Sequence, residues 1–392
     1  MSFNFVADRV VQGRAYPALA QWSAEPYTPA WREFGQHYPY TVPVDIYEHC
    51  AVHNVPYTVY ELDSSWPAGS YYTIAVQFFN FTIDYIGLLS TTVKDHLKTG
   101  RLKLLFYYDE GDNPGNIKQR LDHLCQTHAI PLDCYHFISS NTASEHLPRF
   151  HYFLDAELLY WHRNGKINAV PVHTNPRRKE FTVLSRTHKW WRATVMSDLH
   201  RNKLLENSYW SYNTEIDIND HPEDNPIEVD TLGIRNYIQQ FLTAGPYACD
   251  DLSDQEHNDH TRVEVAHYAD SYCNIVLETH FDADQSGGTF LTEKIFKPIK
   301  HGQPFVIVGP AGSLKALRQA GYRTFDHVID NTYDTITDNT ARWQAVLRTM
   351  QHIQQQDLQA WFELCLPDVV HNQQLFAASK AHRLNTLLER LQ

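Results

Sequence analysis

The chain has 392 residues, a length that favours two domains over a single core. Apolar residues make up 43% and charged residues 20% of it, which is typical of a globular protein and excludes a disordered one. The net charge of -13 argues against a general nucleic-acid binder, whose affinity depends on a basic field. A local basic site for a phosphorylated small molecule is still allowed.

The cysteines and the N-terminus indicate the compartment. Six cysteines show neither a CxxC spacing nor the framework of a small disulfide-rich domain, so we expect reduced thiols. The N-terminus has no basic-then-apolar signal, and no apolar run approaches the roughly 18 residues of a membrane span. These features predict a soluble, cytoplasmic protein.

In the first half of the chain, one stretch has a clear pattern of secondary structure. Residues 1–100 show only short apolar runs and predict no clear element. Residues 102–108, "LKLLFYY", predict a buried strand, residues 116–129 a helix and residues 134–141 another strand. A strand, a helix and a second strand form a βαβ unit, which predicts a parallel sheet.

The pattern restarts after the polar stretch 164–180. Residues 181–185 predict a strand, residues 186–203 a loop and a helix, and residues 208–213 a second strand. The acidic residues 213–230 that follow predict a surface loop.

The last part alternates strands with helices. Residues 274–278 and 304–309 predict strands, and residues 293–302 and 313–321 predict helices that end at Gly302 and Gly321. From Arg342 to Gln392 the periodicity predicts three helices around Pro367. We therefore expect an α/β protein with two Rossmann-like domains facing a cleft, residues 1–175 and 176–355, and a helical tail, residues 356–392, that packs back on them.

The start of the helix at 293–302 carries a candidate site. Thr292 suits the N-cap, and an acid at Glu293 suits the helix dipole, so a well-capped, solvated helix explains both. The glycine pair 287–288 just upstream suits a close approach of the backbone to a ligand. With an anionic ligand there, Glu293 can accept from ribose hydroxyls and Lys294 can meet a phosphate.

Residues 274–309 resemble the donor-binding signature of the α1,3-fucosyltransferase family and related GT-B glycosyltransferases. The matching residues are Asn274, Glu278, Phe290, Thr292, Glu293, Lys294, Ile295, Pro304 and Gly309. The resemblance implies a GT-B fold in which Glu293 binds the ribose and Lys294 the phosphates of a nucleotide sugar, and Glu278 is predicted to belong to the same donor-binding site. It also implies that residues 1–175 hold the acceptor and residues 176–355 the donor.

A second match lies at residues 181–199, where the family carries an arginine for the pyrophosphate. Arg192 stands in that place, and Arg186 and Lys189 are near enough to share the role. The alternative for Arg192 is a solvated residue on an amphipathic helix.

An inverting transfer needs a carboxylate that deprotonates the acceptor hydroxyl, and the sequence leaves open whether the transfer inverts or retains. The resemblance places the base in a loop of the first domain, and Glu110 is our candidate, with Asp109 and Asp112 beside it. Asp155 and Glu157 form a second acidic pair, for which a helical, structural role is the better interpretation.

Three other functions remain open. One is a DNA-modifying GT-B glucosyltransferase with a basic groove at Arg177, Arg178 and Lys179, and another is a non-catalytic sugar- or nucleotide-binding module. The third is a metal-dependent GT-A transferase that uses Asp282 and Asp284. Residues 257–260, "HNDH", have ligand-like spacing, but the 23 histidines of the chain make chance clusters common.

Our prediction is a metal-independent glycosyltransferase without a cofactor. Its expected partners are a nucleotide-sugar donor and a carbohydrate or other hydroxyl acceptor, and neither nucleic acid nor a membrane. Lys297 and Lys300 are interpreted as ordinary helix charges.

Overall fold

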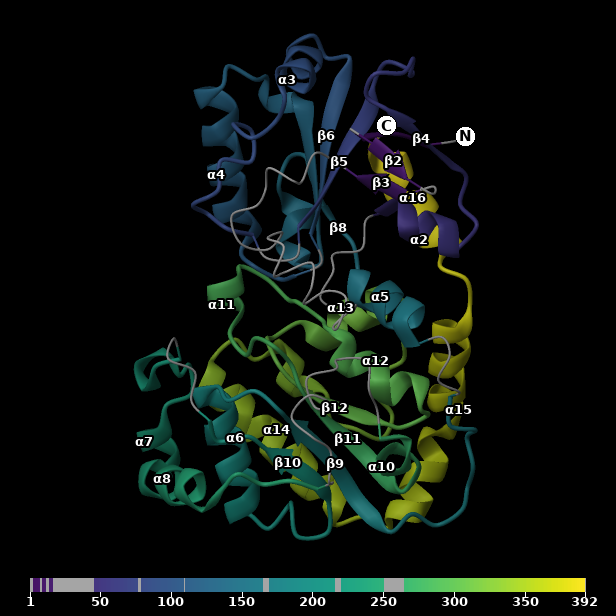
Figure 1. Cartoon of the computed structure of the whole chain (residues 1–392). Helices are drawn as coiled ribbons and strands as arrows, with labels where there is room; N and C mark the ends of the chain where they lie inside the picture. The colour runs from purple at the N-terminus through teal and green to yellow at the C-terminus, as the bar shows by residue number, and fades with distance from the viewer. Residues whose placement is uncertain are drawn as a thin grey trace. The chain divides into compact units, whose positions relative to one another are not determined.

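The computed structural model describes residues 3–7, 9–11, 14–16, 46–76, 79–108, 110–164, 169–215, 220–249 and 264–391 (Figure 1). Asp109 and residues 257–260, both named above, lie outside these residues. The chain divides into two compact units. The first comprises Met1–Arg163, Ser286–Gly288 and Ser379–Gln392, and the second comprises Asn164–Gln285 and Thr289–Ala378.

The described part of the first unit contains a six-stranded parallel sheet with the order β4-β1-β5-β6-β7-β8. The strands are β1 (Phe3–Ala7), β4 (Tyr57–Glu61), β5 (Ser70–Val76), β6 (Leu102–Tyr108), β7 (Tyr135–Ser139) and β8 (Phe150–Tyr152). Strands β2 (Arg9–Val11) and β3 (Arg14–Tyr16) form a separate antiparallel pair.

Helices cover both faces of this sheet (Figure 1). Helices α3 (Thr91–Lys98) and α4 (Pro114–Thr127) pack on one face, and α2 (Ile46–Val52), α5 (Asp155–Asn164) and α16 (Ala381–Leu391) pack on the other. Because both faces are buried, β6 reads as a continuous apolar run instead of an alternating one. Two short 3-10 helices, η3 (Leu132–Cys134) and η4 (Thr142–His146), flank β7.

The second unit contains a four-stranded parallel sheet with the order β10-β9-β11-β12. The strands are β9 (Lys179–Ser185), β10 (Tyr209–Tyr212), β11 (Ser271–Leu277) and β12 (Phe305–Val308). The order reverses at β9, whose neighbours are the second and the third strand of the unit. The carboxyl ends of β9 and β11 therefore form a topological switch point, the place where open α/β sheets bind ligands.

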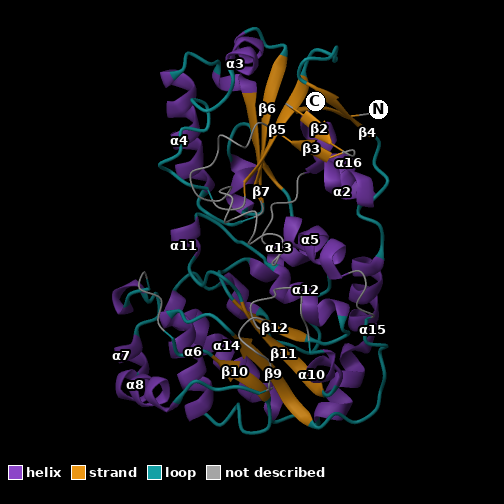
Figure 2. Ribbon diagram, in the orientation of Figure 1, coloured by secondary structure: helices purple, strands orange, loops and turns teal. Residues whose placement is uncertain are grey.

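Figure 2 shows helices on both sides of this second sheet. Helices α10 (Val265–Ala269), α12 (Glu293–Lys300) and α15 (Leu358–Ala377) contact β11, and α14 (Asn339–Gln354) contacts β12. The remaining elements are α6 (Trp190–Arg201), η5 (Pro222–Asp224), α7 (Val229–Leu232), α8 (Arg235–Ala244), α11 (Ala283–Ser286), α13 (Ser313–Gln319) and η6 (Thr332–Thr335). No described helix is long and apolar enough to cross a membrane.

The α/β class, with parallel sheets and a helical C-terminal segment, is confirmed. Three helices, α14 to α16, form that segment, but Pro367 lies inside α15 and not at a break between helices. The chain passes from the first unit to the second between Arg163 and Asn164, and the division after residue 175 stays a prediction. Helix α15 belongs to the second unit and α16 to the first.

Candidate functional site

A pocket of about 330 Å³ lies at the switch point of the second sheet. We call it the switch-point pocket. Three segments line it: the residues after β9, the residues after β11, and part of the acidic segment at 220–230. Its lining residues are Thr187, His188, Lys189, Trp190, Trp191, Asp220, Asp224, Pro226, Thr279, His280, Phe281 and Asp282.

Two lysine ammonium groups converge on Thr279 in the wall of this pocket. Lys189, the N-cap residue of α6, donates from Nζ to the Thr279 carbonyl oxygen at 2.8 Å. Lys294, in the first turn of α12, donates from Nζ to Thr279 Oγ1 at 3.2 Å. Two elements that are about a hundred residues apart in the sequence thus bring positive charge to one point.

The pKa of the neighbouring His280 is lowered, in part by the same cations. Burial lowers the pKa of His280 to about 4, and the cations of Lys189, Arg192 and Lys294 contribute to that lowering. The imidazole is therefore neutral at pH 7, and the positive charge of the site belongs to the fixed cations. A diphosphate is the kind of anion that such a cluster attracts.

The N-terminus of α12 is capped as the sequence predicts. Thr292 Oγ1 accepts from the Lys294 backbone N–H at 3.3 Å and donates to Glu278 Oε2 at 2.7 Å. Helix α12 ends at Lys300, and Gly302, which follows the C-cap residue His301, has a φ of 69°. The cap thereby connects the start of α12 to the residue that directly follows β11.

Glu278 is fully buried, and only part of its carboxylate is satisfied. Its Oε2 accepts from Thr292, while Oε1 has no hydrogen-bond partner among the described residues. Burial raises the pKa of Glu278 in spite of the nearby Lys294. Gly309 explains how the side chain fits, because a Cβ at that position would lie 3.3 Å from Glu278 Cβ. A buried carboxylate oxygen without a partner costs stability, and such atoms gather at functional sites.

Glu293 and Lys294, two of the residues with predicted ligand roles, both remain accessible. Their side chains are 22% and 31% exposed, and Lys294 Nζ lies 3.4 Å from Glu293 Oε1. The carboxylate and the ammonium group therefore stand side by side at the start of α12. This placement is compatible with a ligand that carries both hydroxyl groups and phosphate.

Arg192 is buried, whereas a side chain that binds phosphate directly has to be accessible to the ligand. Its side chain is buried, and its guanidinium donates to the carbonyl oxygens of Thr187 at 3.1 Å and Glu278 at 2.6 Å. Burial lowers its pKa to about 10, and its Nε finds no hydrogen-bond partner in the described part of the chain. Arg192 therefore joins the two loops that line the pocket. Arg186 is half-buried and close enough to act electrostatically on Arg192.

The acidic segment was predicted as a surface loop, but part of it forms pocket walls. Asp220 and Asp224 line the switch-point pocket. The Trp190 indole N–H donates to the Asp220 carbonyl oxygen at 3.1 Å, and His188 Nε2 lies 3.5 Å from Asp220 Oδ2. The segment is thus attached to the start of α6. Sequence reasoning missed these residues, and it also missed Thr279 and His280, although they directly follow a strand that ends at a matched glutamate.

The two glycines at 287 and 288 pack against Asn113 and Asn141. Residues 286–288 belong to the first unit. A Cβ at Gly287, whose φ is 72°, would lie 2.9 Å from Asn113 Cγ, and one at Gly288 would lie 2.5 Å from Asn141 Oδ1. The Asn141 amide also donates to the Ser286 carbonyl oxygen at 2.7 Å. Close packing against two asparagines therefore explains both glycines.

The predicted base, Glu110, is half-buried and follows β6 in the first unit. Asp112 is exposed and accepts from the Tyr108 hydroxyl at 2.5 Å. Asp155 and Glu157 are both buried in α5, as their structural interpretation requires.

Three other sequence interpretations change. Lys300 is buried, which lowers its pKa to about 8, so it is not an ordinary helix charge. Arg177 is buried too and donates to the carbonyl oxygens of Tyr268 and Ser271, so it cannot line an open basic groove. Asp282 lines the switch-point pocket, but nothing is described of the Asp284 side chain. Within the described ranges, no three His, Cys, Asp or Glu residues form a metal-binding group.

Comparisons with known proteins found several solved structures, of which two are described. No family model and no curated protein matches the chain. One structure is a DNA-modifying β-glucosyltransferase, with and without its substrate uridine diphosphoglucose, at 7% identity and a TM-score of 0.37. The other is a mutant of a T4 phage protein, BGT, in complex with UDP-glucose, at 8% identity and a TM-score of 0.34. Each alignment covers 100% of this chain and 99% of the other. At these values the likeness carries no inference about activity.

Proposed function

We propose that this chain is a GT-B glycosyltransferase that binds a nucleoside-diphosphate sugar in its second unit and transfers the sugar to an acceptor hydroxyl. One observation carries the proposal. At the switch point of a parallel sheet, Lys189 and Lys294 converge on Thr279, and Glu293 lies directly beside Lys294. Switch points are where such sheets bind ligands, and paired cations beside a carboxylate suit a ribose diphosphate.

Each of these residues has a proposed role. The ammonium groups of Lys189 and Lys294 bind the diphosphate, together with the backbone N–H groups at the start of α12. Glu293 accepts hydrogen bonds from the ribose hydroxyls. Arg192 positions the two loops by holding the carbonyl oxygens of Thr187 and Glu278.

The reaction breaks the bond between the anomeric carbon and a diphosphate oxygen and forms a bond to the acceptor oxygen. Negative charge grows on the leaving diphosphate, and fixed cations at that point stabilise the transition state. Because lysines can supply this charge, the proposed transfer needs no metal ion. Glu110 is the proposed base that takes the proton of the acceptor hydroxyl.

A thermal-shift series tests the binding part of the proposal. UDP, GDP, UDP-glucose and GDP-fucose are each added in the presence of EDTA, and one or more should raise the melting temperature. Glu293→Ala and Lys294→Met should remove that shift, whereas Lys297→Ala, one turn further along α12, should keep it. The same shift in the first two variants as in the wild type would overturn the proposal. A shift that EDTA abolishes would favour the metal-dependent transferase.

A turnover assay tests the catalytic part. Glu110→Gln should keep the nucleotide shift but lose sugar transfer, because the amide cannot accept the proton. Equal transfer rates in this variant and the wild type would remove Glu110 as the base. Nucleotide binding without any transfer by the wild type, over a panel of hydroxyl acceptors, would instead identify a non-catalytic binding module.

A further inference from the structure

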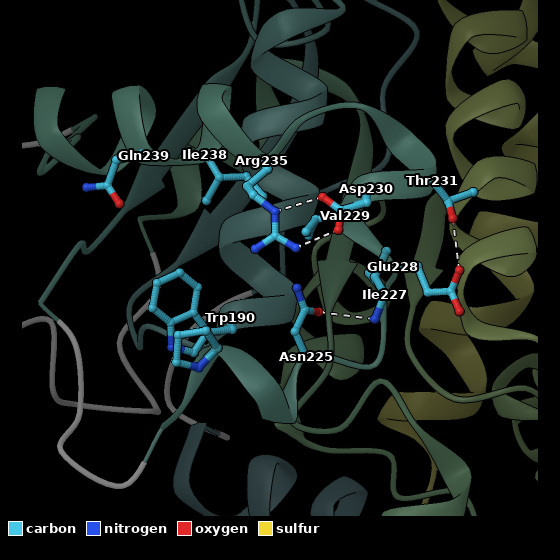
Figure 3. Close-up of a pocket in the computed structure, with 11 residues that line it drawn as sticks. Trp190, Asn225, Ile227, Glu228, Val229, Asp230, Thr231, Arg235, Ile238 and Gln239 are labelled. Carbon is cyan, nitrogen blue, oxygen red and sulfur yellow. Dashed lines mark hydrogen bonds and ion pairs between the residues drawn. The ribbon is translucent and has the colours of Figure 1, made fainter.

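A second pocket of the second unit, of about 480 Å³, lies between α6, α7 and α8 (Figure 3). We call it the α6–α8 pocket. Its volume falls within the range of small-molecule sites. Its lining residues are Trp190, Pro222, Asn225, Ile227, Glu228, Val229, Asp230, Thr231, Arg235, Ile238 and Gln239. Of the described residues, it shares only Trp190 with the switch-point pocket.

Part of the lining of the α6–α8 pocket is apolar. Ile227 and Ile238 are buried there, and the Trp190 ring forms an aromatic wall. The indole N–H of Trp190 donates to the Asp220 carbonyl oxygen, and the ring stands perpendicular to that of His188 at 5.3 Å. The orientation of the indole is therefore fixed before any ligand arrives. A fixed aromatic face of this kind suits the apolar C–H face of a sugar ring.

Polar groups line the pocket beside these apolar residues, and Arg235 and Ile238 both come from α8. Arg235 and Asp230 form a two-pronged pair, with Nε to Oδ1 and Nη2 to Oδ2 both at 2.7 Å (Figure 3). The pair uses Nε and Nη2, and within the described residues no hydrogen bond is found for Nη1. The carboxylate oxygens keep lone pairs as well. A donor and an acceptor thus stand next to each other at the rim, and the Gln239 amide adds one of each.

The charged residues that line the α6–α8 pocket are Glu228, Asp230 and Arg235. Among its described lining residues, Arg235 is the one cation, and Asp230 neutralises it. Glu228 adds a carboxylate that accepts from the Thr231 hydroxyl at 2.8 Å. A phosphate or carboxylate ligand would meet an acidic wall, so the pocket favours a neutral ligand.

We propose that the α6–α8 pocket is a carbohydrate-binding site that takes a neutral pyranose. A sugar hydroxyl both donates and accepts, so neighbouring hydroxyls match Asp230 and the Nη1 group of Arg235 side by side. The C–H face of the ring lies on Trp190. This site goes beyond the proposed function and does not depend on it, because Trp190 is the single lining residue that the two pockets share in the described part of the chain.

Saturation-transfer NMR on the full chain tests the site. The probes are methyl β-D-glucopyranoside, methyl β-D-galactopyranoside and methyl α-L-fucopyranoside at millimolar concentrations, and we expect at least one to bind. Arg235→Ala and Gln239→Ala should each weaken it about fivefold, as expected for one lost hydrogen bond. Arg178→Ala is the matched control, because Arg178 forms an exposed pair with Asp270 elsewhere on the unit.

Two further arms make the outcome decisive. Lys294→Met should leave glycoside binding unchanged, which separates this site from the proposed nucleotide site. The inference is overturned if no glycoside binds, or if Arg235→Ala binds as tightly as the wild type while its melting temperature is unchanged. Binding of choline in place of the glycosides would overturn it as well, because the acidic wall would then hold a cation.

Discussion

Two fully buried glutamates, one in each unit, are held in opposite ways. Both carboxylate oxygens of Glu157 are paired, Oε1 with Lys380 Nζ at 3.0 Å and Oε2 with Arg383. Glu278 has one oxygen bonded to Thr292 and the other without a partner in the described ranges. The first arrangement is complete, and it ties the C-terminal helix α16 to α5. The second is incomplete, and it lies beside the two lysines that meet at Thr279.

The residues around the two glutamates differ in the same way: those near Glu157 are buried and paired, and those near Glu278 are partly accessible. Next to Glu157, the buried Asp155 is in contact with His49 at 3.1 Å and accepts from the Tyr107 hydroxyl. Near Glu278, the side chains of Glu293 and Lys294 are partly open to solvent. Buried charge that is fully paired builds structure, whereas charge that is partly paired and reachable marks a place for a ligand.

The largest effect is expected for Glu157→Gln. The amide would leave the buried Lys380 and its neighbour Arg383 without a counterion, which costs about 3–5 kcal/mol of unfolding free energy. Urea denaturation measures the loss. Glu363→Gln is the control, because that carboxylate is exposed on α15 and bonded to Gln359. A loss as small as that of the control would show that the C-terminal helix is held by its leucines alone.

The next effect concerns acid stability and His301. This imidazole is fully buried, neither ring nitrogen has a hydrogen-bond partner among the residues that the structure describes, and burial lowers its pKa to about 4. Its pKa is lower in the folded than in the unfolded chain. Its neutral form is therefore fully tolerated above pH 6.5, and stability is lost as the pH falls toward 4.

His301→Leu should remove up to about 3 kcal/mol of that acid-induced loss. Urea midpoints at pH 7 and pH 4.5 measure it, with the exposed His382→Leu as the control. If the variant and the wild type lost equal stability between these two pH values, His301 would not be a buried neutral imidazole.

Glu278→Gln should have the opposite sign to Glu157→Gln. The amide can still accept from Thr292, and it removes a buried charge, so we expect a gain of about 1 kcal/mol at neutral pH. The pKa of Glu278 is raised in the folded chain. The free energy of unfolding therefore falls as the pH rises from the usual pKa range of a glutamate to this raised pKa. The variant should lack this decline, which urea midpoints at pH 5 and pH 8 would reveal. A destabilised Glu278→Gln would end the contrast between the two glutamates.

The smallest effect is expected for Arg178→Ala. Arg178 is 80% exposed and pairs with Asp270 at 2.6 Å, and exposed pairs of this kind contribute little to stability because water and salt screen them. Thermal unfolding at low and high salt should show little change. A large loss of stability would mean that exposed ion pairs stabilise the fold as much as buried ones, which would contradict the distinction drawn between Glu157 and exposed charges.

The sequence predicted the elements whose patterns are local. Strand β6 has the predicted bounds, and Thr292 caps α12 as its residue type and position indicate. Glu293 and Lys294 lie together at the start of α12, because helix geometry alone places them there. The convergence of Lys189 and Lys294 on Thr279 could not be predicted, since it depends on the strand order β10-β9-β11-β12.

The remaining failures depend on tertiary contacts. Lys300 looks like a surface charge by helical spacing, but Gln373 of α15 bonds to its backbone carbonyl at 2.8 Å and α15 lies against α12. The acidic composition of residues 213–230 resembles a solvated loop, but tertiary contacts such as that of Trp190 with Asp220 place part of the segment in a pocket wall. The sequences of strands β1, β4 and β5 show no clear apolar–polar alternation, because aromatic residues fill both buried faces of the first sheet.

Calorimetric titration of UDP and GDP tests the central claim most directly. In the presence of EDTA, at least one of them should bind the wild type. Lys294→Met should weaken that binding by about tenfold or more, since a charge-assisted hydrogen bond contributes roughly 1.5–3 kcal/mol. Absence of binding by the wild type, or equal affinities of the wild type and Lys294→Met, would contradict the account.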